Sequence, residues 1–188
     1  MSGDSANLSW LTLDEQEGVE YWLAMNLAGD YAKACHDTIH RNILRELKEK
    51  PLCMIENHHN FAWKEQIDGK EYIVHRKGAT PAALGEWGII PGSMATKGYI
   101  VQGKGEPTAL QSASHGAGRK MSRSLAKANV SMSEMKKVLL QEKVTLIGGG
   151  LDESPHAYKD IDLVMRAQKA LVEVVGSFQP RIVKMAKE

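Results

Sequence analysis

An Asp-Gly pair at positions 68 and 69 is the feature that most restricts the fold of this chain. It separates two short segments, residues 58–66 and 71–75, that have the composition of strands, and Asp-Gly is a strong signal for a tight turn between antiparallel strands. The sequence therefore predicts a β-hairpin. Together with the helical patterns around it, the hairpin favours an α+β fold class. We expect antiparallel hairpins packed against flanking helices, with the functional loops gathered at one edge of the sheet.

Apolar residues recur at helical spacing before the hairpin. The pattern predicts a long helix, or two, that is interrupted near Gly29 and ends before Pro51. Thr12 and Glu15 have the spacing of a capping box at its start.

The C-terminal third also alternates helical and extended patterns. Ser131 and Glu134 form a second predicted capping box, which opens a helix that ends near Lys143. Residues 144–147 are β-branched and apolar and predict a buried strand. Residues 158–175 predict a helix with one apolar face, and residues 178–185 predict a last strand. In the loop at residues 79–88, Trp87 is predicted to be an apolar anchor.

Length and composition limit the class of protein. The chain has 188 residues, of which 43% are hydrophobic, so it can bury a core, and we expect a single domain over residues 1–188 with a frayed end at residues 1–7. The net charge of +1 argues against a general nucleic-acid coat. Cys35 and Cys53 are too few for a disulfide framework, and no signal peptide or membrane-spanning run is visible. We expect a reduced, cytoplasmic protein without membrane contact.

Residues 112–123 carry the strongest chemical signal, Ser-Ala-Ser-His-Gly-Ala-Gly-Arg-Lys-Met-Ser-Arg. Gly116 and Gly118 allow a left-handed backbone and the close approach of a ligand. A helix start here, with Arg119 and Arg123, would attract phosphate. One interpretation is a phosphate site with His115 as a nucleophile or base at its mouth. The other is a glycine turn that enters a surface helix, with His115 simply hydrogen-bonded.

Other histidines are weaker candidates. His58 and His59 begin the first predicted strand, where adjacent side chains point to opposite faces, so only one of them can face a given site. The pair is either metal-binding or polar surface. His36 and His40 lie one helical turn apart but have no third ligand. The basic residues 75–77, which end with Lys77, either bind phosphate or form a solvated strand end.

The motif at residues 115–123 resembles the signature of the RtcB RNA ligases. Four other segments match the family in the same order: His-His-Asn at residues 58–60, His-Arg-Lys-Gly-Ala-Thr at 75–80, Ile-Pro-Gly-Ser-Met at 90–94 and Ala-Tyr-Lys-Asp-Ile-Asp at 157–162. The resemblance runs from about Leu8 to the C-terminus and corresponds to about the C-terminal half of a family member. It implies a ligase that uses GTP and Mn²⁺ to join RNA 2′,3′-cyclic phosphate or 3′-phosphate ends to 5′-hydroxyl ends, in tRNA splicing or RNA repair.

The resemblance also implies roles for individual residues. His115 would be the nucleophile that becomes guanylylated, and His59 would be a manganese ligand. The RNA phosphate would be bound by Lys77, Arg119 and Arg123. Contacts with GTP or the guanylate would come from His59, Asn60, Pro91, Gly92, Ser93, Met94, Gly116, Ala117, Gly118, Tyr158 and Lys184. Lys187 is the alternative to Lys184 as the lysine that contacts guanine.

The chain departs from the family pattern at several points. It has Cys35-His36 where the family usually has Asn-Arg, and Gly98 where a serine is common. The family motifs Gly-Asn-His-Phe and His-Ser-Gly-Ser-Arg-Gly, which supply further manganese ligands, are not found in these 188 residues. One histidine cannot hold a hard divalent ion, so we expect the isolated chain not to ligate RNA.

Three hypotheses remain open at this stage. The chain is the C-terminal part of an RNA ligase, either a fragment or one chain of a split enzyme whose partner brings the metal ligands. An apolar face left uncovered would then associate with the missing half or with a second copy. Alternatively, it is a non-catalytic module that binds guanine nucleotide or RNA, or a truncated product without activity.

Overall fold

A computed structural model describes residues 9–185, and the chain divides between Met54 and Ile55 into two compact units. The predicted frayed end at residues 1–7 and the candidate Lys187 lie outside the described residues. Among the described residues no helix has the length and apolar character needed to cross a membrane. The single domain and the cytoplasmic location stay predictions.

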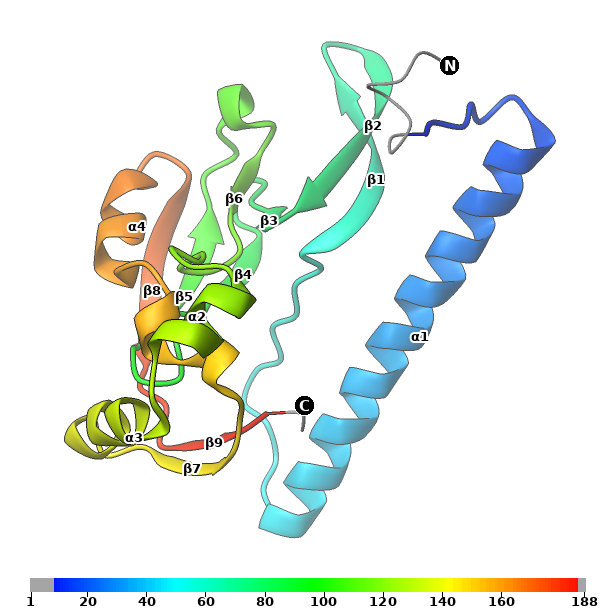
Figure 1. The fold of residues 1–188 in the computed structure, drawn as a ribbon. Coiled ribbons are helices and arrows are strands. Elements are labelled where there is room, and N and C mark those ends of the chain that lie inside the picture. Colours follow the sequence, from blue (N-terminus) through cyan, green and yellow to red (C-terminus); the bar gives the residue numbers. More distant parts are fainter. Residues whose placement is uncertain (1–8, 186–188) are drawn as a thin grey trace. The chain divides into compact units, whose positions relative to one another are not determined.

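The first unit contains one long helix, α1 (Gln16–Leu47), which is drawn as a continuous coil in Figure 1. It ends before Pro51, as predicted, but the expected interruption at Gly29 is wrong. The predicted capping box is also wrong, because Glu15 is the N-cap and has no side-chain cap. The backbone of Thr12 instead lies over the first turn, where a Cβ on Gly18 would come within 1.8 Å of the Thr12 carbonyl oxygen.

The second unit confirms the α+β class, with several small sheets and short helices (Figure 1). The hairpin forms as predicted, because Asp68 and Gly69 take the positive φ values of 51° and 74° that a tight hairpin turn needs. Its strands are β1 (Asn60–Ile67) and β2 (Lys70–Lys77). The other strands are β3 (Ala79–Pro81), β4 (Trp87–Ile90), β5 (Gly98–Gly103), β6 (Ser112–Ser114), β7 (Thr145–Gly148), β8 (Val172–Phe178) and β9 (Ile182–Lys184).

The strands pair in four sheets within the second unit. Antiparallel pairs join β1 to β2 and β3 to β6, and β5 lies between β4 and β8 in an antiparallel three-stranded sheet. The last pair, β7 with β9, is parallel. The helices are α2 (Arg123–Asn129), α3 (Met132–Gln141) and α4 (Ile161–Ala167), and the 3₁₀ turns are η2 (Pro107–Ala109), η3 (Leu151–Glu153) and η4 (Pro155–Ala157).

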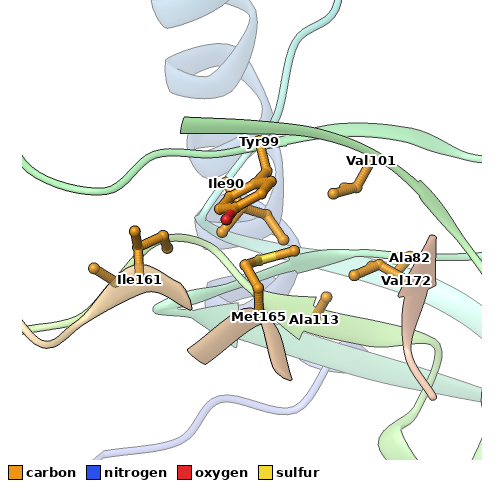
Figure 2. Close-up of a cluster of buried hydrophobic side chains, with 9 residues drawn as sticks. Ala82, Ile90, Tyr99, Val101, Ala113, Ile161, Met165 and Val172 are labelled. Atoms are coloured by element: carbon orange, nitrogen blue, oxygen red, sulfur yellow. The ribbon is translucent and has the colours of Figure 1, made fainter. Parts of the chain in front are cut away.

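Two apolar clusters hold the second unit together. The first lies between the sheet β4-β5-β8 and α4, where Ile90, Val101 and Met165 are buried together (Figure 2). It also takes in Ala113 and Ala117, two residues before and two after His115. The second cluster joins α3, the residue before β7 and the turn after β4 through Met135, Leu139, Val144 and Met94. The loop that carries His115 is therefore anchored in the first core on both sides.

The predictions for residues 158–185 are only partly correct. The helix predicted for residues 158–175 is only α4, which ends at Ala167, and residues 172–178 form β8. The chain turns at Gln168, whose carbonyl oxygen accepts the N–H groups of Leu171 and Val172. Apolar residues in that stretch suit a helix face, but the β-branched Val172 and its neighbours pair with β5 instead. The last strand is correspondingly shorter than predicted, since β9 covers only Ile182–Lys184.

Other local predictions have mixed outcomes. The capping box of Ser131 and Glu134 is confirmed, with both reciprocal hydrogen bonds present. The strand predicted at residues 144–147 exists as β7, but the prediction that it is buried is wrong, because Thr145 and Ile147 are exposed. Trp87 is not an apolar anchor, because it lies in β4 and is 44% exposed.

Arg76 ties the hairpin to the rest of the second unit. Its side chain is buried, and Nη1 and Nη2 bond the two carboxylate oxygens of Glu65 at 2.5 and 2.9 Å. It also donates to Ser112 Oγ at 2.7 Å and to the Leu110 carbonyl at 2.9 Å, and it stacks over the ring of Trp63. Of the basic residues 75–77, the arginine is therefore structural.

This arrangement predicts that Glu65→Ala destabilises the protein by about 3 kcal/mol, because it leaves a buried guanidinium without its carboxylate. The matched control is Glu71→Ala on the same hairpin. Glu71 pairs with Lys64 at 3.5 Å, where both side chains are about half exposed. We expect its loss to change the free energy of unfolding by less than about 1 kcal/mol. Urea unfolding of both variants measures the difference, and equal effects would contradict the structural role of Arg76.

Candidate active site

The rings of His59 and His115 stack on each other. Their centroids lie 5.1 Å apart and their planes differ by 15°. His58 lies against Phe61 and Trp63 instead, with ring centroids 5.3 and 6.5 Å away. Of the two adjacent histidines, His59 is thus the one that reaches the His115 loop, as the resemblance implied.

Gly78 joins the two histidines through its backbone. Its N–H donates to the His59 carbonyl at 3.0 Å, and its own carbonyl accepts the N–H of His115 at 3.3 Å. Gly78 has a φ of 76°, and a Cβ there would lie 3.7 Å from Cε1 of His115. A glycine is needed because this left-handed backbone is unfavourable for other residues.

The turn after β4 holds the other side of the His115 loop. The N–H of Ala117 donates to the Pro91 carbonyl at 3.0 Å. A Cβ on Gly116 would lie 3.1 Å from the same oxygen, so the two backbones approach closely. Three predicted site segments, around residues 59, 91 and 116, therefore meet at His115.

Nδ1 of His115 is buried and has no hydrogen-bond partner among the described residues. Buried polar atoms in folded proteins nearly always have a partner, so an exception needs an explanation. A ring nitrogen in this state suits a group that meets a ligand or takes part in a reaction.

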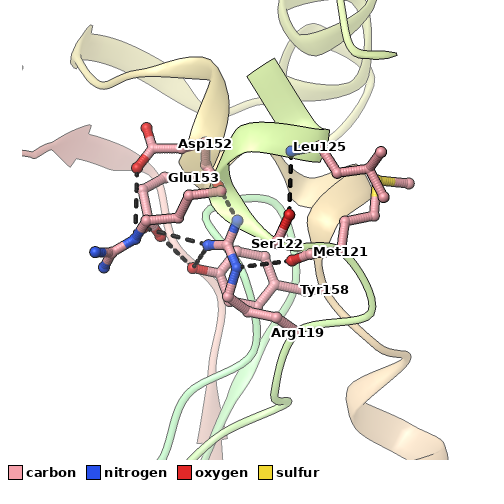
Figure 3. A network of polar contacts seen from close by, with 8 residues as sticks. Arg119, Met121, Ser122, Leu125, Asp152, Glu153 and Tyr158 are labelled. Atoms are coloured by element: carbon pink, nitrogen blue, oxygen red, sulfur yellow. Dashed lines mark hydrogen bonds and ion pairs between the residues drawn. The ribbon is translucent and has the colours of Figure 1, made fainter. Parts of the chain in front are cut away.

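Arg119 is held by a network of contacts beside Tyr158 (Figure 3). Its Nε donates to the Met121 carbonyl at 3.0 Å, and its Nη2 donates to the carbonyl of Asp152. Nη1 lies 3.4 Å from a carboxylate oxygen of Glu153 and 3.3 Å from the hydroxyl of Tyr158. All three guanidinium nitrogens of Arg119 thus have partners within the protein. The side chain of Arg123, in contrast, is 74% exposed, and its Nε lies 3.7 Å from a carboxylate oxygen of Asp152 and of Glu153.

The Tyr158 hydroxyl donates to Glu153, and the ring packs against the Arg119 guanidinium at 5.1 Å. Burial and the Glu153 carboxylate raise the pKa of Tyr158 to about 12. The phenol therefore stays protonated at neutral pH.

The helix start predicted beside the glycines is displaced. Helix α2 begins only at Arg123, and its first turn is capped by Ser122 Oγ, which accepts the N–H of Leu125 at 3.2 Å. Arg119 instead forms a single β-bridge with Tyr158. The helix start therefore lies five residues after Gly118, and phosphate binding at this loop stays a prediction.

A cavity of about 470 Å³ adjoins the His115 loop. It contains both Ser93 and Tyr158, which the resemblance assigned to the guanylate. Lys159 connects it to the loop, because its N–H donates to the Gly118 carbonyl at 3.0 Å and its side chain lies about 4.0 Å from a Cβ built on Gly118. Lys97, Lys120, Glu142, Asp160 and Asp162 also line it, so its walls carry both signs of charge.

The turn that contains Ser93 is tightly packed. A Cβ on Gly92 would lie 2.3 Å from Thr96 Oγ1, and Ser93 N–H donates to that oxygen at 2.6 Å. Met94 is buried in the second core, so only its backbone remains for contact with a nucleotide. The ring of Phe178 fills the space beside Gly98, 2.5 Å from where a Cβ would be, so a side chain at this position would require the ring to move.

Three site candidates, Asn60, Lys77 and Lys184, do not line this cavity. Asn60 and Lys77 face each other at the open end of the hairpin. Lys184 is in β9, where it pairs with Gly148. The structure thus brings together His59, His115 and the turn at residue 91, and it places Ser93 and Tyr158 in one cavity.

The described residues do not fit a manganese ion. Among residues 9–185 no three His, Cys, Asp or Glu side chains gather in a way that could hold a metal. The cysteines Cys35 and Cys53 are both free. The ring of His59, the ligand implied by the resemblance, stacks on the ring of His115.

Two site neighbours were not recognised from the sequence. Glu153 holds Tyr158 and Arg119, and Gln168 accepts a hydrogen bond from Ser114, next to His115. The only signal for Gln168 was a polar residue on an apolar helix face. Nothing in the sequence near Glu153 indicated its partners.

Comparison with known proteins gives consistent matches. The family model described as "tRNA-splicing ligase RtcB" matches residues 2–186. The "RNA-splicing ligase RtcB" of Escherichia coli K12 is 40% identical over 174 residues, which cover 85% of this chain and 43% of the relative. The "tRNA-splicing ligase RtcB" of Nanoarchaeum equitans is 34% identical, covering 92% of this chain and 43% of the relative. The chain therefore spans less than half the length of these relatives.

The Tyr158 contacts predict the effect of Glu153→Gln. Removing the carboxylate charge makes the phenolate easier to form, so the pKa of Tyr158 falls from about 12, but burial keeps it above 10. Ultraviolet titration of tyrosinate at alkaline pH measures the shift, and Tyr158→Phe identifies the affected step. An unchanged titration in Glu153→Gln would show that the carboxylate does not act on the phenol.

Proposed function

This chain belongs to the RtcB family, and we propose that it supplies the GTP-reactive part of an RNA ligase, with His115 as the residue that accepts the guanylate. The observation that carries the proposal is the state of His115. Its ring is stacked on His59, its Nδ1 is buried without a partner among the described residues, and its loop is fixed on both sides. A nucleophile held in this way is oriented before its substrate arrives.

In the proposed reaction, a neutral imidazole nitrogen of His115 attacks the α-phosphorus of GTP. The new N–P bond forms as the bond from the α-phosphorus to the bridging oxygen breaks, and pyrophosphate leaves with that electron pair. The imidazole loses its N–H proton to solvent. The result is a phosphoramidate, which is labile enough to pass the guanylate on.

Two further displacements would complete ligation. An oxygen of the RNA 3′-phosphate attacks the guanylate phosphorus, and the bond to His115 breaks. The RNA 5′-hydroxyl then attacks the activated 3′-phosphate and loses its proton, which forms the phosphodiester and releases GMP. A 2′,3′-cyclic phosphate is first opened by water to the 3′-phosphate.

Ser93 and Tyr158 support a nucleotide contact because they line one cavity next to the His115 loop. The Tyr158 hydroxyl already donates to Glu153, so we propose that the tyrosine offers its ring to the base. Lys184 is proposed as the lysine that contacts guanine, by resemblance alone. For the RNA phosphate, the exposed Lys77 and Arg123 are better placed than Arg119, which would have to give up protein contacts.

We propose no step through Mn²⁺, because the described residues do not offer enough ligands. If the family reaction needs the metal, the other ligands come from a complementary half and not from residues 9–185 of this chain. The chain alone should then be inactive. A non-catalytic module that binds guanine nucleotide is the second candidate, and the missing metal ligands are the observation that favours it.

Labelling with GTP tests the proposal. The 188-residue chain is incubated with α-labelled GTP and Mn²⁺, alone and with the remaining part of the E. coli relative. We expect acid-labile label on the chain only in the mixture. His115→Ala should abolish it, and His75→Ala, which changes an exposed histidine on β2, should retain it.

The other outcomes decide between the candidates. Label on the chain alone would contradict the need for added metal ligands. GTP binding by calorimetry without label in either mixture would favour the non-catalytic module. Label that survives His115→Ala would overturn the assignment of the nucleophile.

A further inference from the structure

Gln168 is a buried polar residue at the end of α4, with only 5% of its surface exposed. Its side-chain oxygen accepts the N–H of Ser114 at 2.9 Å. Its side-chain nitrogen donates to the sulfur of Met165 at 3.2 Å. Since Ser114 directly precedes His115, this side chain reaches from α4 to the backbone of the proposed nucleophile.

The Ser114 N–H needs such a partner because of the sheet geometry. Strand β6 pairs only with β3 in its two-stranded sheet, with Ser114 opposite Ala79. The N–H of His115 points toward β3 and donates to the Gly78 carbonyl. Successive N–H groups of a strand point to opposite sides, so the Ser114 N–H points to the side where β6 has no neighbouring strand. On that side the Gln168 side chain accepts the Ser114 N–H, which would otherwise be a backbone donor left without a partner at a cost in stability.

Ser114 in turn connects the two sides of His115. Its hydroxyl donates to the Gly116 carbonyl at 2.6 Å, and the Gly116 N–H donates to Ser114 Oγ at 3.4 Å. A change in the Ser114 peptide would therefore move the residues before and after His115 together. Such a rotation would also shift the His115 ring over His59.

Gln168 is itself firmly placed. Its carbonyl accepts the N–H groups of Leu171 at 2.9 Å and Val172 at 3.3 Å, at the start of β8. The side chain thus begins from a fixed backbone, packs in the core and ends on the Ser114 N–H. Because this connection is short and buried, it fixes the position of the Ser114 N–H relative to α4.

We propose that Gln168 is a positioning residue for His115, which holds the Ser114 peptide so that the imidazole presents its reactive nitrogen in a fixed orientation. The proposal rests on the assignment of His115 as the guanylate acceptor, but the hold on Ser114 can be tested without that activity.

The test compares variants that keep or remove the side-chain oxygen of residue 168, which accepts the Ser114 N–H. Gln168→Met removes it at similar volume, and Gln168→Asn shortens the side chain so that the amide cannot reach Ser114. Gln168→Glu keeps an oxygen in place. The matched control, Met165→Leu, removes only the sulfur partner on the other side of the amide.

Two readouts are taken on the full chain by NMR: hydrogen exchange of the Ser114 amide and the ¹⁵N shifts of the His115 ring, which report its tautomer. We expect exchange at Ser114 to become at least about 10-fold faster in Gln168→Met and Gln168→Asn, with altered His115 shifts. Gln168→Glu and Met165→Leu should stay near wild type. Unchanged exchange and shifts in both Gln168→Met and Gln168→Asn would overturn the proposal, even if wild type takes no label.

The third readout is the rate of label transfer to His115 at saturating GTP, with the complementary half added. We expect that rate to fall roughly 10- to 100-fold in Gln168→Met, with the Kd for GTP little changed and recovery in Gln168→Glu. If Gln168 only stabilised the fold, its substitution would lower the free energy of unfolding but would not reduce the labelling rate while leaving the Kd for GTP unchanged. Faster Ser114 exchange with a wild-type labelling rate would also contradict positioning. If wild type takes no label at all, it is the proposed function that fails.

Discussion

The candidate site depends on the backbone of Gly78, which is bonded to His59 on one side and to His115 on the other. Through these two bonds, the hairpin and the His115 loop, which are far apart in the sequence, are fixed at one place. The stack of the two rings follows from this junction, because each ring projects from a residue that Gly78 holds. Arg76 strengthens the same junction, since it connects the hairpin to Ser112 at the start of β6.

The basic residues of the chain show how a charge pattern can have a structural purpose. Arg76 and Arg119 both stand in segments whose composition suggests phosphate binding, yet both direct their guanidinium groups into the protein. Each is paired with a glutamate and stacked on an aromatic ring, Trp63 or Tyr158. Arginine suits this task because its planar fork makes several directed bonds at once. Of the arginines in these motifs, Arg123 keeps most of its surface exposed.

Some features with a local cause were predictable from the sequence, although the capping box of Thr12 and Glu15 was not among them. The Asp68-Gly69 turn and the capping box of Ser131 and Glu134 formed as expected, because each depends on residues within a few positions. The boundary between α4 and β8 was not, since the same apolar spacing fits a helix face, and pairing with β5 decided the outcome. Gln168 and Glu153 were not identified as site neighbours, because their partners are distant in the sequence or defined only by the folded loop. The motifs located His59 and His115, but their contact required the fold.

The Phe178 ring that fills the space beside Gly98 has an evolutionary consequence. The two positions face each other across β5 and β8, so a side chain at one leaves room only for a smaller group at the other. Substitutions at these sites are therefore coupled in evolution: a serine at position 98 requires either that the Phe178 ring, which is 44% exposed, turns away or that residue 178 becomes smaller.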